Sequence, residues 1–321
     1  FRFFVGESML WCSIDRKLRR KNARFSSDHL GLWWPILVLP WLLLYPPRLL
    51  GKALVFNKLK KLVGNNFRSG IAGGGAYPEA IDKFFWAVGI KVVEGYGLTE
   101  TSPIVSVRPI AAPIMRTVGT PIRGLEARVV DDNGQDLGRC RKGSLQLRGP
   151  TVMQGYYKMP DETKAMFTED GYLKTGDLGW MDKDRYIMLC GRAKNLIVTN
   201  GGKNVYPEEI EDAFQLYDDV QQVTVRGYYA DDDKTSEEIE ALIYPSDDLY
   251  KRLGFERNNE FVQEEVLEAI QKTVSKVNKT FQSYSQITKV TLLKEPLEMT
   301  TSQKVKRNFT PNVYSIPLIN K

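Results

Sequence analysis

The spacing of apolar residues changes along the chain, and each change predicts a different kind of structure. From Leu49 to Leu62 apolar residues recur at helical spacing, and residues 67–72 have the composition of a short buried strand. A helix is expected from Pro78 to Gly89, because proline favours the first helical turn and glycine favours the end. Residues 90–94 return as a strand, which predicts a strand–helix–strand unit of an α/β sheet. The apolar face of the helix is expected to comprise Ile81, Phe84, Phe85 and Val88.

Two further regions follow this unit. Between residues 118 and 188 the apolar runs are short and alternating, and turn residues such as Asn133-Gly134 separate them, which predicts a small β-structure. Beyond Arg192 the pattern is that of a separate small α/β lobe, with a boundary near Ala193 and Lys194. Its expected elements are a helix over 207–217, strands over 220–228 and 238–245, and a long helix over 258–278.

Composition limits the chemistry that the chain can perform. Its 321 residues, 42% of them hydrophobic, are enough for about two domains with ordinary cores. The single histidine, His29, stands beside an apolar run and is interpreted as structural, which excludes Ser-His-Asp hydrolysis and most zinc sites. Cys12, Cys140 and Cys190 form no CxxC pair, which argues against a disulfide framework and favours a reducing, cytoplasmic location. The chemistry must therefore depend on charge, positioning and magnesium.

Charge is concentrated near the start of the chain. The net charge is +6, and a basic cluster from Arg16 to Arg24 precedes an almost uncharged, tryptophan-rich run from Leu30 to Tyr45. The run contains prolines and is shorter than the roughly 20 residues of a membrane-spanning helix. Two interpretations remain open for residues 16–45: peripheral contact with the inner face of the membrane, and burial in a core. No nucleic-acid partner is expected, because basic and aromatic residues do not interleave.

Several motifs occur in a fixed order along the chain. Tyr96-Gly97-Leu98-Thr99-Glu100-Thr101 comes first, and Thr175-Gly176-Asp177 precedes Gly191-Arg192-Ala193-Lys194. The run from Gly201 to Glu211 and then Thr300-Thr301-Ser302-Gln303-Lys304 complete the series. In this order they resemble the adenylate-forming synthetases, a family that holds acyl-CoA synthetases, luciferases and peptide-synthetase adenylation domains. The likeness is greatest to the long-chain fatty acyl-CoA synthetases.

The resemblance implies an α/β fold with two domains. Residues 1–192 would be the C-terminal part of a large AMP-binding domain, made of a basic and apolar segment (1–64), an α/β unit (65–117) and a β-subdomain (118–192). Residues 193–321 would form a small, mobile α+β lid domain. The Ser/Thr/Gly-rich phosphate loop of the family should precede Gly73 and is not in these residues, and the chain starts with Phe1 rather than Met. Both observations predict a fragment.

The resemblance also assigns residues to the nucleotide. Tyr96 is expected to stack on adenine and Thr99 to contact the α-phosphate, with Gly97 between them. Glu100 is expected to hold Mg²⁺, which prefers hard oxygen ligands. A wall of the same pocket, where small or absent side chains leave room for a ligand, is expected at Gly74, Gly75 and Ala76.

The later motifs are expected to complete the site. By resemblance Asp177 accepts hydrogen bonds from both ribose hydroxyls, and Arg192 contacts ribose or phosphate. Lys194 stands at the family hinge, where a change of backbone torsion swings the small domain between two poses, a domain alternation. The expected residues along the coenzyme A tunnel are Gly202 and Lys203.

Lys304 is the expected catalytic residue of the first half-reaction. In the family a lysine in this late loop bridges the attacking carboxylate and the α-phosphate, where a cationic donor stabilises the developing charge. Lys306 and Arg307 are close by and leave the register open, although Thr300-Thr301 before Lys304 favours that residue.

These roles imply a long-chain fatty acid–CoA ligase that uses ATP, Mg²⁺ and coenzyme A. The fatty carboxylate would attack the α-phosphate of ATP to give an acyl-adenylate and pyrophosphate, and the thiol of coenzyme A would then displace AMP. A thiol acceptor explains why no protein nucleophile or imidazole base is needed. The alternatives are an acyl-carrier-protein ligase, a medium-chain or aryl-CoA ligase, and a non-catalytic nucleotide-binding fragment without the phosphate loop.

Overall fold

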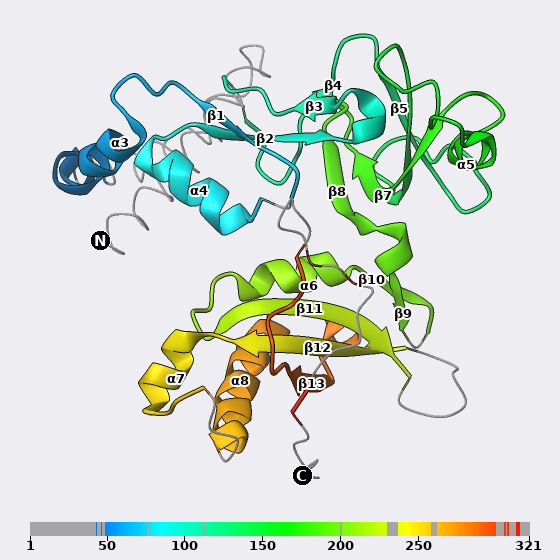
Figure 1. Ribbon diagram of the computed structural model, residues 1–321. Helices are drawn as coiled ribbons and strands as arrows, with labels where there is room; N and C mark the ends of the chain where they lie inside the picture. The colour runs from blue at the N-terminus through cyan, green and yellow to red at the C-terminus, as the bar shows by residue number, and fades with distance from the viewer. Residues whose placement is uncertain are drawn as a thin grey trace, which may run out of the picture. The chain divides into compact units, whose positions relative to one another are not determined.

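The computed structural model describes most of the chain from residue 49 onwards (Figure 1). The described residues are 49–75, 77–111, 113–199, 201–229, 237–257 and 262–299, with Leu43, Pro46, Val305, Arg307, Val313 and Tyr314. Apart from Leu43, the segment Arg16–Tyr45, for which membrane contact or burial was expected, lies outside them, as does His29. Among the helices of the described part, none is long and apolar enough to cross a membrane.

The chain divides into two compact units, and each is described by itself. The first contains residues 1–126, 149–154 and 184–188, and the second contains residues 127–148, 155–183 and 189–321.

A four-stranded sheet of order β1-β2-β3-β4 organises the first unit. Strands β1 (Gly70–Ala72) and β2 (Val92–Gly97) are parallel, and helix α4 (Glu79–Val88) connects them, as the sequence predicts. Strands β3 (Ile104–Val107) and β4 (Thr120–Pro121) continue the sheet in antiparallel order. The predicted helix over 49–62 is also confirmed, as a five-residue π-helical segment η1 (Lys52–Phe56) followed by α3 (Asn57–Val63).

The predicted apolar face of α4 is only partly correct. Val88 is buried and packs with Phe56 and Ile90, whereas Ile81 is 37% exposed. The neighbouring Asp82 is buried instead, because its carboxylate pairs with the guanidinium of Arg108 at 2.5 Å. A buried ion pair therefore changes the orientation that apolar spacing alone predicts.

The predicted β-structure after residue 118 is a sheet of order β5-β6-β7-β8. Its strands are β5 (Glu126–Val130), β6 (Gly143–Arg148), β7 (Leu173–Met181) and β8 (Ile187–Arg192), and a helix, α5 (Pro160–Met166), precedes β7. Burial alternates along β7, with Thr175 and Asp177 buried and Gly176 exposed between them. This two-residue period places the two polar side chains on the same face of the strand.

The residues after Arg192, called the small lobe here, contain a mixed sheet of order β11-β12-β13. Strands β11 (Val220–Tyr228) and β12 (Glu238–Pro245) are antiparallel, and β13 (Lys289–Leu292) is parallel to β12. The other elements of the lobe are η3 (Ala193–Asn195), β9 (Ile197–Thr199), β10 (Lys203–Val205), α6 (Pro207–Phe214), α7 (Asp247–Leu253), α8 (Gln263–Asn278) and η5 (Ser283–Ser285).

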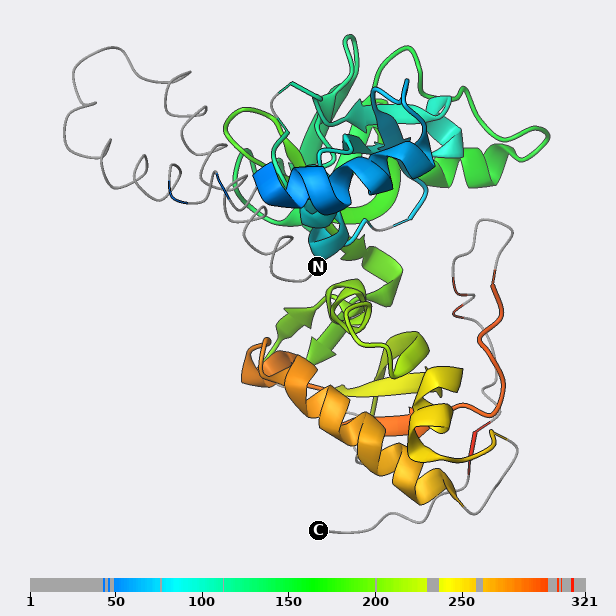
Figure 2. The same ribbon diagram turned by 90° about the vertical axis from the view of Figure 1, so that its left-hand side faces the viewer.

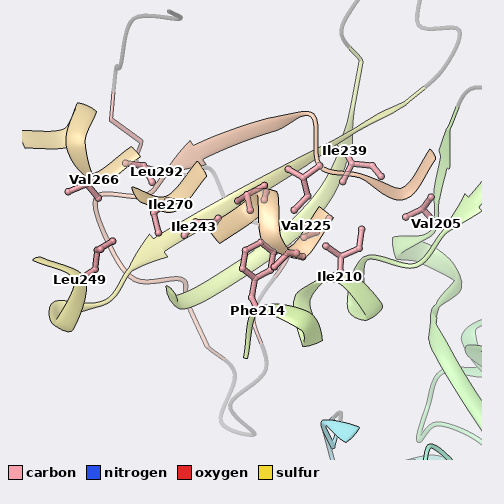
Figure 3. Packing of buried hydrophobic residues seen from close by; sticks show 14 of the residues in the cluster. Val205, Ile210, Phe214, Val225, Ile239, Ile243, Leu249, Val266, Ile270 and Leu292 are labelled. Atoms are coloured by element: carbon pink, nitrogen blue, oxygen red, sulfur yellow. The ribbon is translucent and has the colours of Figure 1, made fainter. Parts of the chain in front are cut away.

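The two faces of this sheet have different cores. On one face Ile239, Ala241 and Ile243 of β12 pack with residues of α6 and α8, and Figure 2 shows α8 lying along the sheet. Figure 3 shows Ile210 and Phe214 of α6 in the same cluster. On the other face Leu242 and Tyr244 form a second cluster, with Leu293, Leu297, Val305 and Val313. The alternation along β12 therefore separates the helices on one face from the C-terminal segment on the other. This name refers to the described residues from Leu293 to Tyr314.

The bounds of β11 and β12 are those that the sequence predicts, while α8 begins at Gln263 rather than at residue 258. The sequence did not predict α5, α7, β9, β10 or β13. The short strands among them pair with partners that their own sequence does not specify.

Asp212 is a source of pH-dependent stability in the small lobe. Burial, and then the nearby Glu208 and Glu209 carboxylates, raise the pKa of Asp212 to about 6. Since this folded-state pKa exceeds the unfolded value, the folded lobe binds more protons between about pH 4 and pH 6, and Asp212 lowers stability progressively as pH rises through that range.

We therefore expect Asp212→Asn to raise the free energy of unfolding at pH 7 by about 1 kcal/mol, with a smaller gain at pH 4. Urea unfolding at both pH values measures this difference. Glu268→Gln is the matched control, because that side chain is 67% exposed on α8 and its removal should change stability by less than about 0.5 kcal/mol. A gain for Asp212→Asn that is equal at the two pH values would contradict the explanation.

Candidate functional site

The motif Tyr96–Thr101 stands at the end of β2 in the first unit. The sequence predicts that this strand ends at residue 94. In the structure it extends to Gly97, so Tyr96 and Gly97 lie within the strand. A Cβ atom at Gly97 would lie 1.8 Å from the carbonyl oxygen of Pro103, which excludes every residue with a side chain. The amide of Leu98 donates to that same carbonyl at 2.9 Å, so the chain reverses tightly here.

Thr101 stabilises the turn, and the sequence did not single it out. Its buried hydroxyl accepts from the Leu98 amide at 3.1 Å and lies 2.9 Å from the carbonyl oxygens of Leu98 and Pro103. The turn leaves Thr99 exposed and Glu100 partly exposed, and the Glu100 carbonyl accepts from the amide of Met153 at 2.8 Å. The motif thus presents two oxygen-bearing side chains on a braced turn.

A buried arginine holds the strand that leads to this turn. The side chain of Arg108 is 0% exposed, and it pairs with Asp82 of α4 and, at 2.8 Å, with Glu94 of β2. Its Nε donates to the Thr117 carbonyl at 2.9 Å, and its amide donates to the Glu94 carbonyl at 2.9 Å. Glu94 is two residues before Tyr96, so this contact fixes the approach to the motif. A single charged residue in sequence gives no sign of such burial.

The glycine-rich turn lies beside the motif, because β1 and β2 are parallel and Ala72 pairs with Glu94. A Cβ atom at Gly73 would lie 3.1 Å from the Gly95 carbonyl oxygen, so the two backbones approach closely there. Gly74 has a φ of +86°, and among the described residues no atom lies within 4 Å of a Cβ placed on Gly74 or Gly75. Within that part of the chain the space beside these two glycines is open, which is compatible with a pocket wall. Ala76 is outside the described residues.

The structure brings Asp177 and Arg192 together in the second unit. Asp177 Oδ1 lies 2.8 Å from Arg192 Nε, and the carboxylate side chain is only 9% exposed. Arg192 also donates to the Thr175 carbonyl at 3.0 Å, while the Thr175 hydroxyl accepts from the Asp177 amide at 3.0 Å. The alternation along β7 places the Asp177 carboxylate, and the end of β8 places the Arg192 guanidinium. A buried carboxylate therefore lies beside a partly exposed positive charge.

Lys194 and Gly202 lie in the small lobe. Lys194 is exposed in the short helical turn η3, directly after β8. Strands β9 and β10 pair antiparallel with Lys203 opposite Thr199, and Gly202 lies in the turn between them. Among the described residues nothing lies within 4 Å of a Cβ placed on Gly202, and its φ is +69°. This left-handed backbone conformation favours glycine there.

Lys304 lies outside the described residues, but Arg307 is described. Arg307 Nη2 lies 2.9 Å and 2.7 Å from the two carboxylate oxygens of Glu211, so its charge already has a partner. The sequence predicts no role for Glu211 beyond its place at the end of the Gly201–Glu211 motif. Within the part of the chain that the structure describes, no group of three or more His, Cys, Asp or Glu side chains could hold a metal ion. Glu100 remains the predicted single carboxylate for magnesium.

Family models match both parts of the chain. The model of the AMP-binding enzyme matches residues 41–157, and the model of the AMP-binding enzyme C-terminal domain matches residues 194–317. Together these matches cover well over half of the sequence. The chain belongs to the family of AMP-binding enzymes. The resemblance that the motifs indicate is thereby confirmed for this adenylate-forming family.

Relatives of this family member fall into more than one type. It is 34% identical to the probable acyl-activating enzyme 16 of Arabidopsis thaliana, over 84% of this chain and 40% of the relative. It is 33% identical to the long-chain-fatty-acid–[acyl-carrier-protein] ligase AEE15 of the same plant, over 85% of this chain and 38% of the relative. It is 36% identical to the long-chain-fatty-acid–CoA ligase FadD15 of Mycobacterium tuberculosis, over 59% of this chain and 30% of the relative. The chain thus spans well under half the length of these relatives.

Solved structures share the mixed α/β fold of this AMP-binding enzyme. ATP-bound MatB from Rhodopseudomonas palustris superposes with a TM-score of 0.58 at 28% identity, over 74% of this chain and 44% of that one. The O-succinylbenzoate coenzyme A synthetase MenE from Bacillus subtilis, in complex with ATP and magnesium ion, gives a TM-score of 0.62 at 23% identity. That comparison covers 78% of this chain and 49% of that one, and it supports the fold alone.

The turn after β2 should tolerate no side chain at Gly97. We expect Gly97→Ala to lower the free energy of unfolding by about 1–3 kcal/mol, because the new methyl group would overlap the Pro103 carbonyl. Gly75→Ala is the matched control, since its Cβ would meet nothing within 4 Å and should change stability by less than about 0.5 kcal/mol. Urea unfolding of the two variants measures the difference. Equal stabilities would show that the close approach at Gly97 is relaxed in solution.

Proposed function

We propose that this chain is part of an ATP-dependent acid–thiol ligase that activates a long-chain fatty acid as an acyl-adenylate and transfers it to coenzyme A. The observation that carries the proposal is the braced turn after β2, which presents Thr99 and Glu100 at the carboxyl edge of a parallel strand pair. The open glycines Gly74 and Gly75 lie at the same edge. Ligands bind at this edge in open α/β sheets.

We assign the nucleotide roles that the family resemblance implies, and these positions are compatible with them. Tyr96 would stack on adenine, Thr99 would contact the α-phosphate, and Glu100 would hold a magnesium ion, which neutralises phosphate charge when bound. Asp177 would receive the ribose hydroxyls, with Arg192 beside it for ribose or phosphate. The observed Asp177–Arg192 pair supports this assignment, because it orients the carboxylate.

The small lobe would supply one residue set to each half-reaction. Rotation at Lys194 would bring Lys304 to the α-phosphate during adenylation, and would bring Gly202 and Lys203 to the coenzyme A tunnel during thioester formation. Catalysis in both steps would be by positioning and electrostatic stabilisation. The incoming thiol is the nucleophile of the second step, so no protein nucleophile is required.

An acyl carrier protein is a second candidate acceptor, because the carrier-protein ligase AEE15 matches 85% of this chain and the CoA ligase FadD15 matches 59%. The deciding experiment supplies the complete gene product that contains this chain with ATP, magnesium and C8 to C18 or aromatic acids. Coenzyme A and holo acyl carrier protein are offered in separate reactions. Thioester on coenzyme A with long acids supports the first proposal, and thioester only on the carrier protein supports the second. Preference for short or aromatic acids would change the substrate class, and nucleotide binding without adenylate would indicate a non-catalytic protein.

Lys304 is expected to act in adenylation. In the complete protein we expect Lys304→Ala to lower the rate of acid-dependent pyrophosphate release by about 10²- to 10³-fold, because one preorganised cationic donor is lost. ATP affinity should change much less. Lys306→Ala is the register control and should retain most of the rate. A larger loss for Lys306→Ala would move the catalytic role to that residue.

Gly202 is expected to act only in the thioester step. We expect Gly202→Leu to spare pyrophosphate release and to reduce thioester formation by at least about tenfold, because a side chain would enter the coenzyme A path. Gly201→Leu is the matched control. Gly201 is the adjacent residue and has a φ of +78°, so a leucine there is under a similar backbone strain. Equal thioester rates in the two variants would attribute the effect to backbone strain.

A further inference from the structure

Glu211 is the most heavily bonded carboxylate of helix α6. Its Oε1 accepts from the Val225 amide at 2.7 Å and from the Thr224 hydroxyl at 3.2 Å. Arg307 Nη2 lies 2.9 Å from Oε1 and 2.7 Å from Oε2. Burial raises the pKa of the Glu211 carboxyl, and the facing Arg307 guanidinium opposes that rise. This carboxylate is therefore both desolvated and charge-paired, which makes the loss of its partner expensive.

The same pair occupies the free edge of strand β11. Among the described strands, the order β11-β12-β13 leaves one side of β11 without a neighbour, and Val225 pairs with Ala241 on the other side. The amide and the carbonyl of one strand residue point to the same side. Glu211 accepts from the Val225 amide, and Arg307 Nη1 donates to the Val225 carbonyl at 2.9 Å. The two side chains satisfy this edge as a neighbouring strand would, and they join α6, β11 and the C-terminal segment.

The C-terminal segment has further contacts around residue 304. Val305 forms an antiparallel bridge with Met299, and it packs on the face of the sheet that carries Leu242 and Leu293. Residues 300–304 connect the two bridge partners. Arg307 is three residues beyond Lys304, so their Cα atoms can be at most about 11 Å apart. Val305 and Arg307, which follow Lys304 in the chain, are therefore both held by the lobe.

We propose that Arg307 and Glu211 form a positioning pair that sets the register of the Lys304 segment on the small lobe for the adenylation step. This inference rests on the proposed function. Neither residue needs to touch substrate, and both act through the chain that carries Lys304. Because thioester formation uses the opposite set of residues, around Gly202, the pair should matter for one half-reaction and not for the other.

The test measures the two half-reactions separately in the complete protein. Arg307→Gln and Glu211→Gln should lower acid-dependent pyrophosphate release by about 10- to 100-fold, since a displacement of about 1 Å at a catalytic group has effects of this size. Thioester formation from supplied acyl-adenylate should stay within about threefold of the wild type. Arg307→Lys keeps the charge but not the paired geometry, and should recover part of the adenylation rate.

Arg226→Gln is the matched control. Arg226 is the next residue of β11, and its Nε pairs with Glu240 of β12 at 2.8 Å rather than with a carboxylate of α6. This variant also loses an arginine–carboxylate pair in the same lobe, and both half-reactions should remain within about threefold of the wild type. Equal losses in the two half-reactions of folded Arg307→Gln, or an unchanged adenylation rate, would overturn the proposal. So would an equal loss of adenylation in Arg226→Gln.

Amide hydrogen exchange gives a readout that does not depend on activity. Arg307→Lys and Arg307→Gln should exchange faster than the wild type in peptides that cover residues 305–314, and at the wild-type rate in peptides that cover α8. Unchanged exchange in residues 305–314 would overturn the positioning pair, even if an activity were lost. If the wild type forms no adenylate from any acid, the proposed function fails, and this exchange result still decides whether Arg307 fixes the segment.

Discussion

The guanidinium of Arg108 is fully buried, and it carries a positive charge that the interior can hold only with close partners. Asp82 comes from the connecting helix and Glu94 from the central strand of the first unit, and the Thr117 carbonyl takes a further N–H group. This one side chain therefore joins helix, strand and loop. Glu94 lies in β2, three residues before that strand ends at Gly97, and the turn that presents Thr99 and Glu100 follows the strand, so its position depends on this network.

Arginine–carboxylate pairing recurs at two candidate segments of the second unit. Arg192 meets Asp177 beside the predicted ribose position, and Arg307 meets Glu211 at the edge of β11. The planar guanidinium suits this role, because it stays charged and can offer several donors in fixed directions to oxygen acceptors. In a chain with one histidine, such pairs fix the direction of charged side chains without an imidazole.

Local patterns predicted the elements whose burial is set by their own residues. Strands β11 and β12 have the predicted bounds because their apolar runs are long and bounded by polar turns. Helix α4 ends at Gly89 as predicted, since glycine readily takes the left-handed conformation found there. Strands β9, β10 and β13 are only three or four residues long; β9 and β10 pair with each other across a short turn, and β13 pairs with the distant β12. No periodicity can be read from such short segments.

The sequence by itself identified the family and the motif Tyr96–Thr101 at the end of β2. This motif has a local signature, because Gly97 and its neighbours are constrained by contacts within a few residues. Only the tertiary structure decided which charged residues are buried. Asp82 and Arg108 are 26 residues apart, and Glu211 and Arg307 are 96 apart. In sequence each one is like any solvated charge. Burial of a charge depends on a partner that folding brings from far along the chain, and this long-range pairing has no local signature.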